Sequence, residues 1–247
     1  MRPTAEPAPG PLRLGVGICA LNEEVGLGRL LPRLLGEGED RADVVVVADG
    51  GSRDRTRALT RGSGALLHEG ACGRGAQLSA AGRRLLDEGA DVLLFLHADS
   101  LPSEGALSAV RAAFEEGGLV AAGMAQRVAA PGRAFRWIEA AADARVRRGM
   151  VFGDSALSVG AADYLAAGGF EPVPLFEDVR LSERLRRLGR VRLLEEAQIE
   201  VSARRWEQEG ILQCTLRNWI LRGMHRLGVA PAHLVRLYRP FRRRSPD

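Results

Sequence analysis

The sequence has 247 residues, of which 46% are hydrophobic and 27% charged, and its formal net charge is +4. A chain of this length can bury a full core, and its composition is that of an ordinary soluble protein, which argues against a disordered or membrane-embedded chain. No lysine occurs, so all 35 basic residues are arginine. The mild basic excess suits an anionic partner, such as a nucleotide, a lipid phosphate or a membrane surface.

The cysteines and the start of the chain indicate the cellular compartment. Cys19, Cys72 and Cys214 are far apart and show no metal-ligand spacing, which is typical of reduced, cytosolic thiols. No run of 18 apolar residues occurs, so a membrane-spanning helix is not expected. Residues 1–12 are rich in Pro and Ala and lack an apolar signal core, so we expect a disordered tail. The chain is therefore predicted to be cytoplasmic, with association at the inner face of the membrane left open.

The first half of the chain alternates apolar runs with helical patterns. Strands are predicted at 13–19, 43–48, 65–68 and 92–96. Helices are predicted at 26–35 and 56–61, and from the glycine-containing loop 69–77 to about residue 89. This alternation indicates an α/β fold with a largely parallel sheet and helices on both faces. Ligands of such sheets bind at the carboxyl ends of the strands.

Residues 15–20 match the dinucleotide fingerprint GxGxxA. That fingerprint requires a strand before its first glycine and a helix through its last residue. Here the glycines lie inside the predicted strand, so a dinucleotide site is not expected.

The strand 92–96 is apolar throughout and ends abruptly in His97, Ala98 and Asp99. An Asp at the carboxyl end of a buried strand can hold a divalent cation or a ligand hydroxyl. Pro102 is predicted to stop any further strand pairing. As an alternative, Asp99 caps the next helix, but Ser103 is the better-placed cap for a helix that begins near residue 104.

Polar residues follow two other predicted strands. Asp49 ends the second strand and can meet a ligand, or it can only shape the turn formed by Gly50 and Gly51. Arg74 lies among glycines at a helix start, where free amides and a guanidinium suit anion binding; a solvated Arg is the equal alternative.

The second half contains further helices and strands. Helices are predicted at 103–116, 133–148, 161–167 and 179–188, and strands at 119–128, 156–159, 191–194 and 199–202. Glu177 and Asp178 stand at the start of the helix 179–188, where the helix dipole favours acidic residues on structural grounds alone. The same placement keeps a carboxylate ionised, so that it can accept a proton from a hydroxyl.

Residues 211–247 are predicted to form a basic, amphipathic, helical C-terminal extension. Five apolar residues recur there at helical spacing: Leu212, Leu216, Trp219, Ile220 and Met224. The chain then ends in a cluster of arginines at 242–244. Such an extension can lie on an anionic membrane, or it can dock on its own domain, which is the more common outcome.

Four segments together resemble the family 2 glycosyltransferases of the GT-A fold. They are Asn22-Glu23-Glu24, residues 49–56 (DGGSRDRT), His97-Ala98-Asp99 and Glu177-Asp178, in that order along residues 14–205. The segments FLHAD and RRWE, at 95–99 and 204–207, are similar to those of a small bacterial cytosolic subgroup whose acceptors are poorly defined.

The resemblance implies a GT-A catalytic domain over residues 13–210, with a Rossmann-like, mostly parallel sheet. It implies transfer of a sugar from a nucleoside diphosphate donor to a small or lipid-linked acceptor, with Mn²⁺ or Mg²⁺ as cofactor. The residues it assigns to donor binding are Leu21, Asn22, Glu23, Asp49, Gly50, Arg74, Gln77, His97, Ala98 and Asp99. Asp99 would also hold the metal that bridges the diphosphate.

The resemblance also implies roles in the reaction. Asp178 would be the general base of an inverting displacement, and Glu177 would support it. On the acceptor side it suggests Asp154, Arg205 and Trp206, although core packing is an equal interpretation of the Trp.

Three positions depart from the family pattern. Gly50 stands where a second Asp is common, which leaves the nucleotide base open. His97 replaces the first Asp of the metal motif and could bond a ribose hydroxyl, coordinate the metal or be structural. Ser202 replaces the Gln of the QxxRW element, which argues against a processive synthase.

The sequence argues against two other functions. A nucleotidyltransferase would carry a Gly-rich basic loop after the first strand, where this chain has the acidic segment 21–24. A nucleic-acid-binding module would interleave aromatic with basic residues, and the aromatic residues here are too sparse, so no nucleic acid partner is expected.

Overall fold

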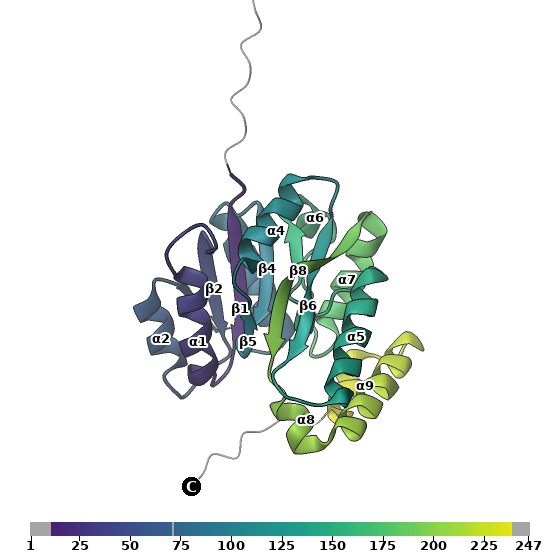
Figure 1. Cartoon of the computed structure of the whole chain (residues 1–247). Helices are drawn as coiled ribbons and strands as arrows, with labels where there is room; N and C mark the ends of the chain where they lie inside the picture. Colours follow the sequence, from purple (N-terminus) through teal and green to yellow (C-terminus); the bar gives the residue numbers. More distant parts are fainter. Residues whose placement is uncertain (1–10, 71, 239–247) are drawn as a thin grey trace, which may run out of the picture.

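The computed structural model describes residues 11–70 and 72–238. The predicted tail at the N-terminus lies almost wholly outside the described residues, as does the arginine cluster at 242–244. The described part folds around one eight-stranded sheet flanked by helices, which confirms the predicted α/β class (Figure 1). No helix among the described residues is long and apolar enough to cross a membrane.

The strands follow one another across the sheet in an order that differs from their order in the chain. Across the sheet they are β3 (Leu66–Glu69), β2 (Val44–Asp49), β1 (Leu14–Ala20), β4 (Val92–His97), β7 (Ser158–Gly160), β6 (Ala121–Val128), β8 (Val191–Val201) and β5 (Ser100–Pro102). The pairs β3–β2, β2–β1, β1–β4 and β6–β8 are parallel, whereas β7 and β5 pair antiparallel with their neighbours. The sheet is therefore mostly parallel, as predicted.

Ten α-helices occur within the described residues. They are α1 (Glu24–Leu35), α2 (Thr56–Ser63), α3 (Arg74–Asp87), α4 (Ala106–Glu115), α5 (Arg133–Arg147), α6 (Ala161–Ala166), α7 (Glu177–Leu188), α8 (Arg204–Glu209), α9 (Ile211–Arg226) and α10 (Pro231–Leu237). Apolar side chains of α1 and α4 pack into the core on one face of the sheet, and those of α3, α6 and α7 pack on the other. This burial on both faces explains why β2 and β4 are apolar at nearly every position.

The glycines of β1 permit this two-sided packing. A Cβ atom on Gly17 would lie 3.0 Å from the Phe95 ring, and one on Gly15 would lie 2.8 Å from the Cβ of Ala90. Both glycines lie within β1, as predicted, so they serve strand packing.

Three local predictions were wrong. Pro102 does not end the pairing, because residues 100–102 form β5 against β8. The following helix begins at Ala106 after Gly105 and has no side-chain cap; instead the Ser103 Oγ accepts the backbone N–H of Gln198. The two strands predicted between 191 and 202 are one strand, β8, whose pairing with β6 shifts register and resumes at Gln198.

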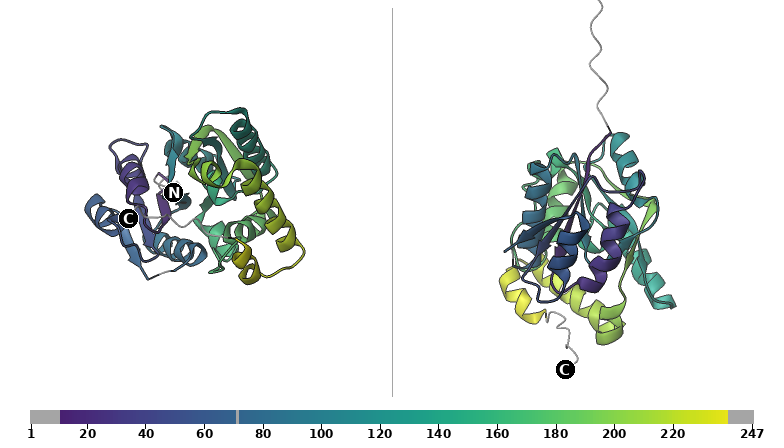
Figure 2. Two further views of the ribbon diagram at one scale, coloured as in Figure 1. Left: turned by 90° about the horizontal axis from the view of Figure 1, so that it is seen from below. Right: turned by 90° about the vertical axis from the view of Figure 1, so that its left-hand side faces the viewer.

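The C-terminal helices dock on the domain. Leu221 of α9 and Leu234 of α10 are buried against Leu175, Phe176 and Val179, at the start of α7. Figures 1 and 2 show α8 and α9 at the end of the molecule where β6 and β8 finish. The predicted boundary at 210 and 211 falls between α8 and α9, and the division into two parts stays a prediction.

Candidate active site at the carboxyl ends of the strands

All four motif segments lie where strands end or where α7 begins. Asn22 follows β1, Asp49 ends β2, His97 ends β4, and Glu177 and Asp178 form the first turn of α7. The parallel pairing of β2, β1 and β4 puts the first three at one edge of the sheet. Segments that lie far apart in the sequence therefore meet at the edge where α/β sheets bind ligands.

The loops after β1 and β2 are bound to each other through backbone amides. The Asn22 Oδ1 accepts the N–H of Arg53 at 2.8 Å, and the Asn22 N–H is donated to the Ser52 Oγ at 2.8 Å. The Glu23 N–H is donated to the Thr56 Oγ1 at 2.9 Å. Asn22 adopts a left-handed conformation, which Asn tolerates better than most residues. The two loops thus form one fixed wall, and Leu21 on it is 53% exposed.

The Asp49 carboxylate closes its own turn. It is 1% exposed and accepts the N–H of Gly51 and of Ser52, each at 3.0 Å. The structure therefore gives Asp49 the turn-shaping role that the sequence left open, and a contact with a nucleoside stays a prediction.

Gly50 lies against the amide of Gln77, which explains why this position lacks a side chain. Gln77 donates from Nε2 to the carbonyl oxygens of Ala20 and Ala48 at 2.8 and 2.7 Å, and so ties the ends of β1 and β2. A Cβ on Gly50 would start 3.1 Å from that Nε2. A second carboxylate at position 50 would therefore require Gln77 to move.

Asp178 is a buried carboxylate held by two backbone amides and one cation. Its Oδ2 accepts the N–H of Gly153 at 3.0 Å, and its Oδ1 accepts the N–H of Val179 at 2.8 Å. The Arg74 guanidinium lies 4.0 Å from Oδ2. Burial alone would raise the pKa of Asp178, but Arg74 and the Gly153 N–H outweigh it and hold that pKa below its ordinary value. Asp178 is therefore an anion at neutral pH.

Glu177 forms an ion pair with Arg74. Its side chain is 1% exposed, its Oε1 accepts the Nε–H of Arg74, and its Oε2 has no hydrogen-bond partner among the described residues. Burial and the neighbouring Asp178 raise the pKa of Glu177, against the effect of Arg74. Burial also raises the pKa of the nearby Cys19 thiol to about 12, so this cysteine is not a thiolate nucleophile.

His97 lies beside the same cluster. A side chain on Gly153 would collide with the Nε2 of His97, so the ring and the loop are in close contact. Burial and the charge of Arg74 lower the pKa of His97, while Asp99, Asp178 and other carboxylates oppose them. At neutral pH the ring is the neutral imidazole.

Asp99 lies at the mouth of a small hollow beside the start of α1. Its side chain is 41% exposed, and Arg204 lies 3.8 Å from it and 4.0 Å from Glu23. The hollow has a volume of about 120 Å³, and Gly26 and Ser202 also line it. Ala98 is buried under the start of α1.

A divalent cation is the cofactor that the resemblance implies. Among the described residues, no three His, Cys, Asp or Glu side chains come together to form a complete metal site. Mg²⁺ and similar ions are, however, commonly held by one or two carboxylates, with water and substrate phosphates supplying the other ligands. The half-exposed Asp99 carboxylate fits an ion of that kind.

The three residues predicted on the acceptor side have intramolecular partners. Asp154 accepts a hydrogen bond from Arg145. Trp206 packs edge-to-face on Phe135, with ring centroids 6.1 Å apart. Arg205 donates a hydrogen bond to the Tyr238 hydroxyl. The core-packing interpretation of Trp206 is thus realised, and the acceptor roles of all three residues stay predictions.

Sequence reasoning missed two residues of the site. Gly153 binds Asp178 through its N–H and contacts His97, yet it belongs to none of the four motif segments. Arg204, next to Asp99 and Glu23, lies in the RRWE segment that carried part of the resemblance. That motif was the available signal for Arg204, whereas nothing local in the sequence distinguishes Gly153.

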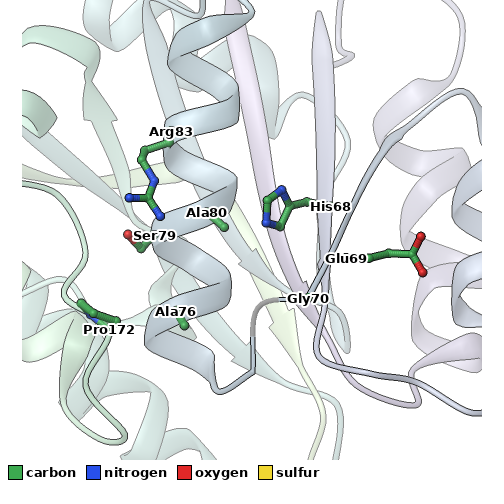
Figure 3. A pocket seen from close by; sticks show the side chains of 8 residues that line it. All are labelled: His68, Glu69, Gly70, Ala76, Ser79, Ala80, Arg83 and Pro172. Carbon is green, nitrogen blue, oxygen red and sulfur yellow. The ribbon is translucent and has the colours of Figure 1, made fainter.

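A larger hollow of about 460 Å³ lies between β3 and α3. Figure 3 shows His68 on one side of it and Arg83 on the other, with Ala76 and Ala80 of α3 between them. None of the predicted site residues lines this hollow, so size alone does not identify the active site.

Comparison with known proteins gave one family match and many structural matches. The model of glycosyl transferase family 2 matches residues 15–152, which is more than half of the chain. No curated protein matches the sequence.

Solved structures with the same fold include the following three. TarS from S. aureus (residues 1–349) has 15% identity and a TM-score of 0.60, with 78% of this chain and 61% of TarS covered. The mannosyltransferase PcManGT from Pyrobaculum calidifontis, in complex with GDP-Man and Mn²⁺, has 18% identity and a TM-score of 0.61, with coverages of 76% and 56%. Glucosyl-3-phosphoglycerate synthase from Mycobacterium tuberculosis, with Mn²⁺ and UDP, has 20% identity and a TM-score of 0.55, with coverages of 77% and 71%. At these identities the likeness concerns the fold, and the chain spans 61% of TarS, so whole-protein activities do not follow from it.

Proposed function

The chain belongs to glycosyl transferase family 2, and from this we propose that it transfers a sugar from a nucleoside diphosphate donor to an acceptor hydroxyl. The observation that carries the proposal is the cluster of Asp178, Arg74 and His97, an ionised carboxylate beside a guanidinium and a neutral imidazole at the ligand-binding edge of the sheet. Structures of the same fold that contain UDP or GDP-Man support a nucleotide-linked donor.

Donor binding is assigned to the wall formed by the loops after β1 and β2. Asn22 and Glu23 belong to that wall, and their backbone is fixed by the hydrogen bonds described above, so little conformational entropy remains to be lost on binding. Arg74, at the first position of α3, is the cation for the donor phosphates, because a guanidinium and a helix start both favour a phosphate.

We assign the metal to Asp99, with Mn²⁺ or Mg²⁺ as the ion. When bound, such an ion neutralises charge on the departing diphosphate. Arg204, 3.8 Å from Asp99, adds a positive charge beside that carboxylate. The chain itself thus supplies one anion for the metal and cations for the phosphates.

Asp178 is assigned as the general base of an inverting displacement. A carboxylate with a lowered pKa is a weak base, but it is fully ionised at neutral pH and can take the acceptor proton as the new bond forms. Its Oδ2 is oriented by the Gly153 N–H. Glu177 is assigned a positioning role, because it holds Arg74 while Arg74 faces Asp178.

The acceptor is proposed to be small or lipid-linked, with Asp154, Arg205 and Trp206 on its side of the site. No observation in the structure favours a nucleotidyltransferase or a nucleic-acid-binding module.

The direct test is turnover of a panel of nucleotide sugars by the full chain in the presence of Mn²⁺ or Mg²⁺. We expect slow donor hydrolysis with one nucleotide class and none after chelation of the metal. If no nucleotide sugar binds or turns over with any divalent ion, the proposed function is wrong.

A further inference from the structure

Helix α9 turns a row of large apolar side chains toward solvent. They are Leu212 (81% exposed), Leu216 (55%), Trp219 (65%), Ile220 (54%) and Leu227, at the helix end (87%). Spacings of four, three, one and seven residues put all five on one side of a helix with 3.6 residues per turn. We refer to these five residues as the outer stripe of α9.

The side of α9 that faces the domain carries both apolar and polar side chains, and Met224 packs there beside Leu221. Cys214 and Leu221 are buried there, but Arg217 forms an ion pair with Glu209 and is only 20% exposed. Helices on the surface of a water-soluble protein normally keep their large apolar side chains on the inner side and polar ones on the outer side. The outer stripe is thus the part of α9 that remains without a cover among the described residues.

We propose that the outer stripe of α9 docks on an anionic lipid bilayer. Leu and Trp side chains suit the boundary between acyl chains and headgroups, where an amphipathic helix lies in the plane of the membrane. Docking would remove from water apolar surface that costs roughly 25 cal/mol per Å².

The charge of this part of the sequence complements such a membrane. Arg226 is exposed one residue before Leu227. The nine residues that follow Tyr238 contain Arg239 and three arginines at 242–244, with a single acid, Asp247. Arginine side chains near an anionic membrane surface are attracted to it electrostatically. The predicted cytoplasmic location fits, since anionic lipids are enriched in the cytoplasmic leaflet.

A second copy of the chain fits the stripe less well. A stable protein–protein interface uses roughly 20–30 residues on each side. The outer stripe offers five side chains in one row on one helix. A bilayer, by contrast, accepts a single helix face without requiring a shaped partner.

The stripe lies at the site end of the molecule. The opposite side of α9 packs through Leu221 on Phe176, the residue before Glu177, and Phe176 stacks on His225 of α9 with ring centroids 4.8 Å apart. Docking would therefore bring the start of α7, with Asp178, close to the bilayer surface. The consequence that a membrane-borne acceptor reaches Asp178 rests on the proposed function, whereas docking itself does not.

The test is flotation of the full chain with vesicles of phosphatidylcholine, with and without phosphatidylglycerol. The double variant Leu212→Ser/Trp219→Ser should lose more than about tenfold in vesicle affinity, because two anchoring side chains are removed. The control Leu165→Ser removes a residue that is 63% exposed on α6, at the other end of the molecule, and should bind as the parent does (Figure 1). We expect binding that requires the anionic lipid and falls with salt.

Three results would overturn the proposal: no binding of the parent chain to anionic vesicles at low salt, unchanged binding of the double variant, or a dimer in light scattering that the double variant abolishes. Circular dichroism of each variant checks that it is folded. Donor hydrolysis without vesicles is measured in parallel, so failure of the docking proposal is distinguishable from failure of the proposed function.

Discussion

At the level of single residues, the central feature is a guanidinium shared by two buried carboxylates. Arg74 is ion-paired with Glu177 and lies 4.0 Å from Asp178. Both carboxylates raise the pKa of Arg74 against the effect of burial. When a donor phosphate reaches Arg74, this guanidinium already interacts with the carboxylates of Glu177 and Asp178.

The substitution Asp178→Asn tests the base assignment. Asn keeps the size of the side chain and can still accept the Gly153 N–H, but it cannot take a proton. We expect transfer to fall by about 10²-fold or more, in line with the usual contribution of a general base, while donor affinity stays within a few-fold. Initial rates with saturating donor and calorimetric donor titration measure the two quantities. Retention of full transfer would refute the assignment.

The substitution Arg74→Gln tests the electrostatic coupling through the pH dependence. Burial raises the pKa of Asp178, and Arg74 is the largest of the opposing causes that bring it below its ordinary value. Removing Arg74 should therefore raise that pKa, so that the base becomes protonated, and transfer declines, at a higher pH than in the parent. The pH profile of the transfer rate at saturating donor is the measurement. A profile whose acid limb does not move would contradict the coupling.

At the level of elements, the start of α3 depends on a close approach to the segment before α7. A Cβ on Gly75 would lie 2.5 Å from the carbonyl oxygen of Glu171 and 2.6 Å from that of Val173. Since both neighbours are backbone atoms, they cannot yield without moving the chain. Because Gly75 follows Arg74, this approach also positions the guanidinium.

We expect Gly75→Ala to lower the free energy of unfolding by about 1–3 kcal/mol, as overpacking does. The matched control is Gly28→Ala in α1, where nothing lies within 4 Å of the added Cβ. That change should instead raise stability by about 0.5–1 kcal/mol, because Ala is the better helix former. Denaturant unfolding of both variants gives the comparison, and a Gly75 variant as stable as the parent would show that the approach is not tight.

The sequence was a good guide to elements that patterning specifies. Strands β2 and β4, which are apolar runs, lie within one or two residues of their predicted bounds. The same holds for α7, which ends just before Gly189. Local patterning did not reveal β5, because a three-residue strand containing Pro102 exists only through its pairing with β8. The single strand β8 was divided for the same reason, since its register shift depends on β6.

The same distinction separates the site residues that the sequence could place from those that it could not. Residues at strand ends, such as Asp99, could be placed from the sequence because strand carboxyl ends share an edge of the sheet. The partnership of Glu177 with Arg74 could not, because the two are 103 residues apart and meet only through packing of α3 near α7. The sequence shows that Gly50 departs from the family pattern. The contact of Gly50 with the Gln77 amide, which explains this departure, appears only in the tertiary structure.

At the scale of the whole molecule, three features meet at one end. They are the carboxyl edge of the sheet, the group of Arg74, Glu177 and Asp178, and the C-terminal helices. β1, β2 and β4 bring their loops there, and α9 packs behind the first turn of α7. The net charge of +4 over the whole chain, in which every basic residue is arginine, suits both a diphosphate and an anionic surface. The opposite end, with α6 and the start of β1, carries none of the motif residues (Figure 1).

The measurement that tests the central claim most directly is calorimetric titration of nucleotide sugars into the full chain with and without Mn²⁺, repeated for Asp99→Ala. The account predicts that one class of nucleotide sugar binds, that Mn²⁺ strengthens its binding, and that the variant loses most of this gain, by about tenfold or more in affinity. The control Asp163→Ala removes a carboxylate on α6, far from the site, and should leave the titration unchanged. Failure of every nucleotide sugar to bind the parent chain with any divalent ion would contradict the account.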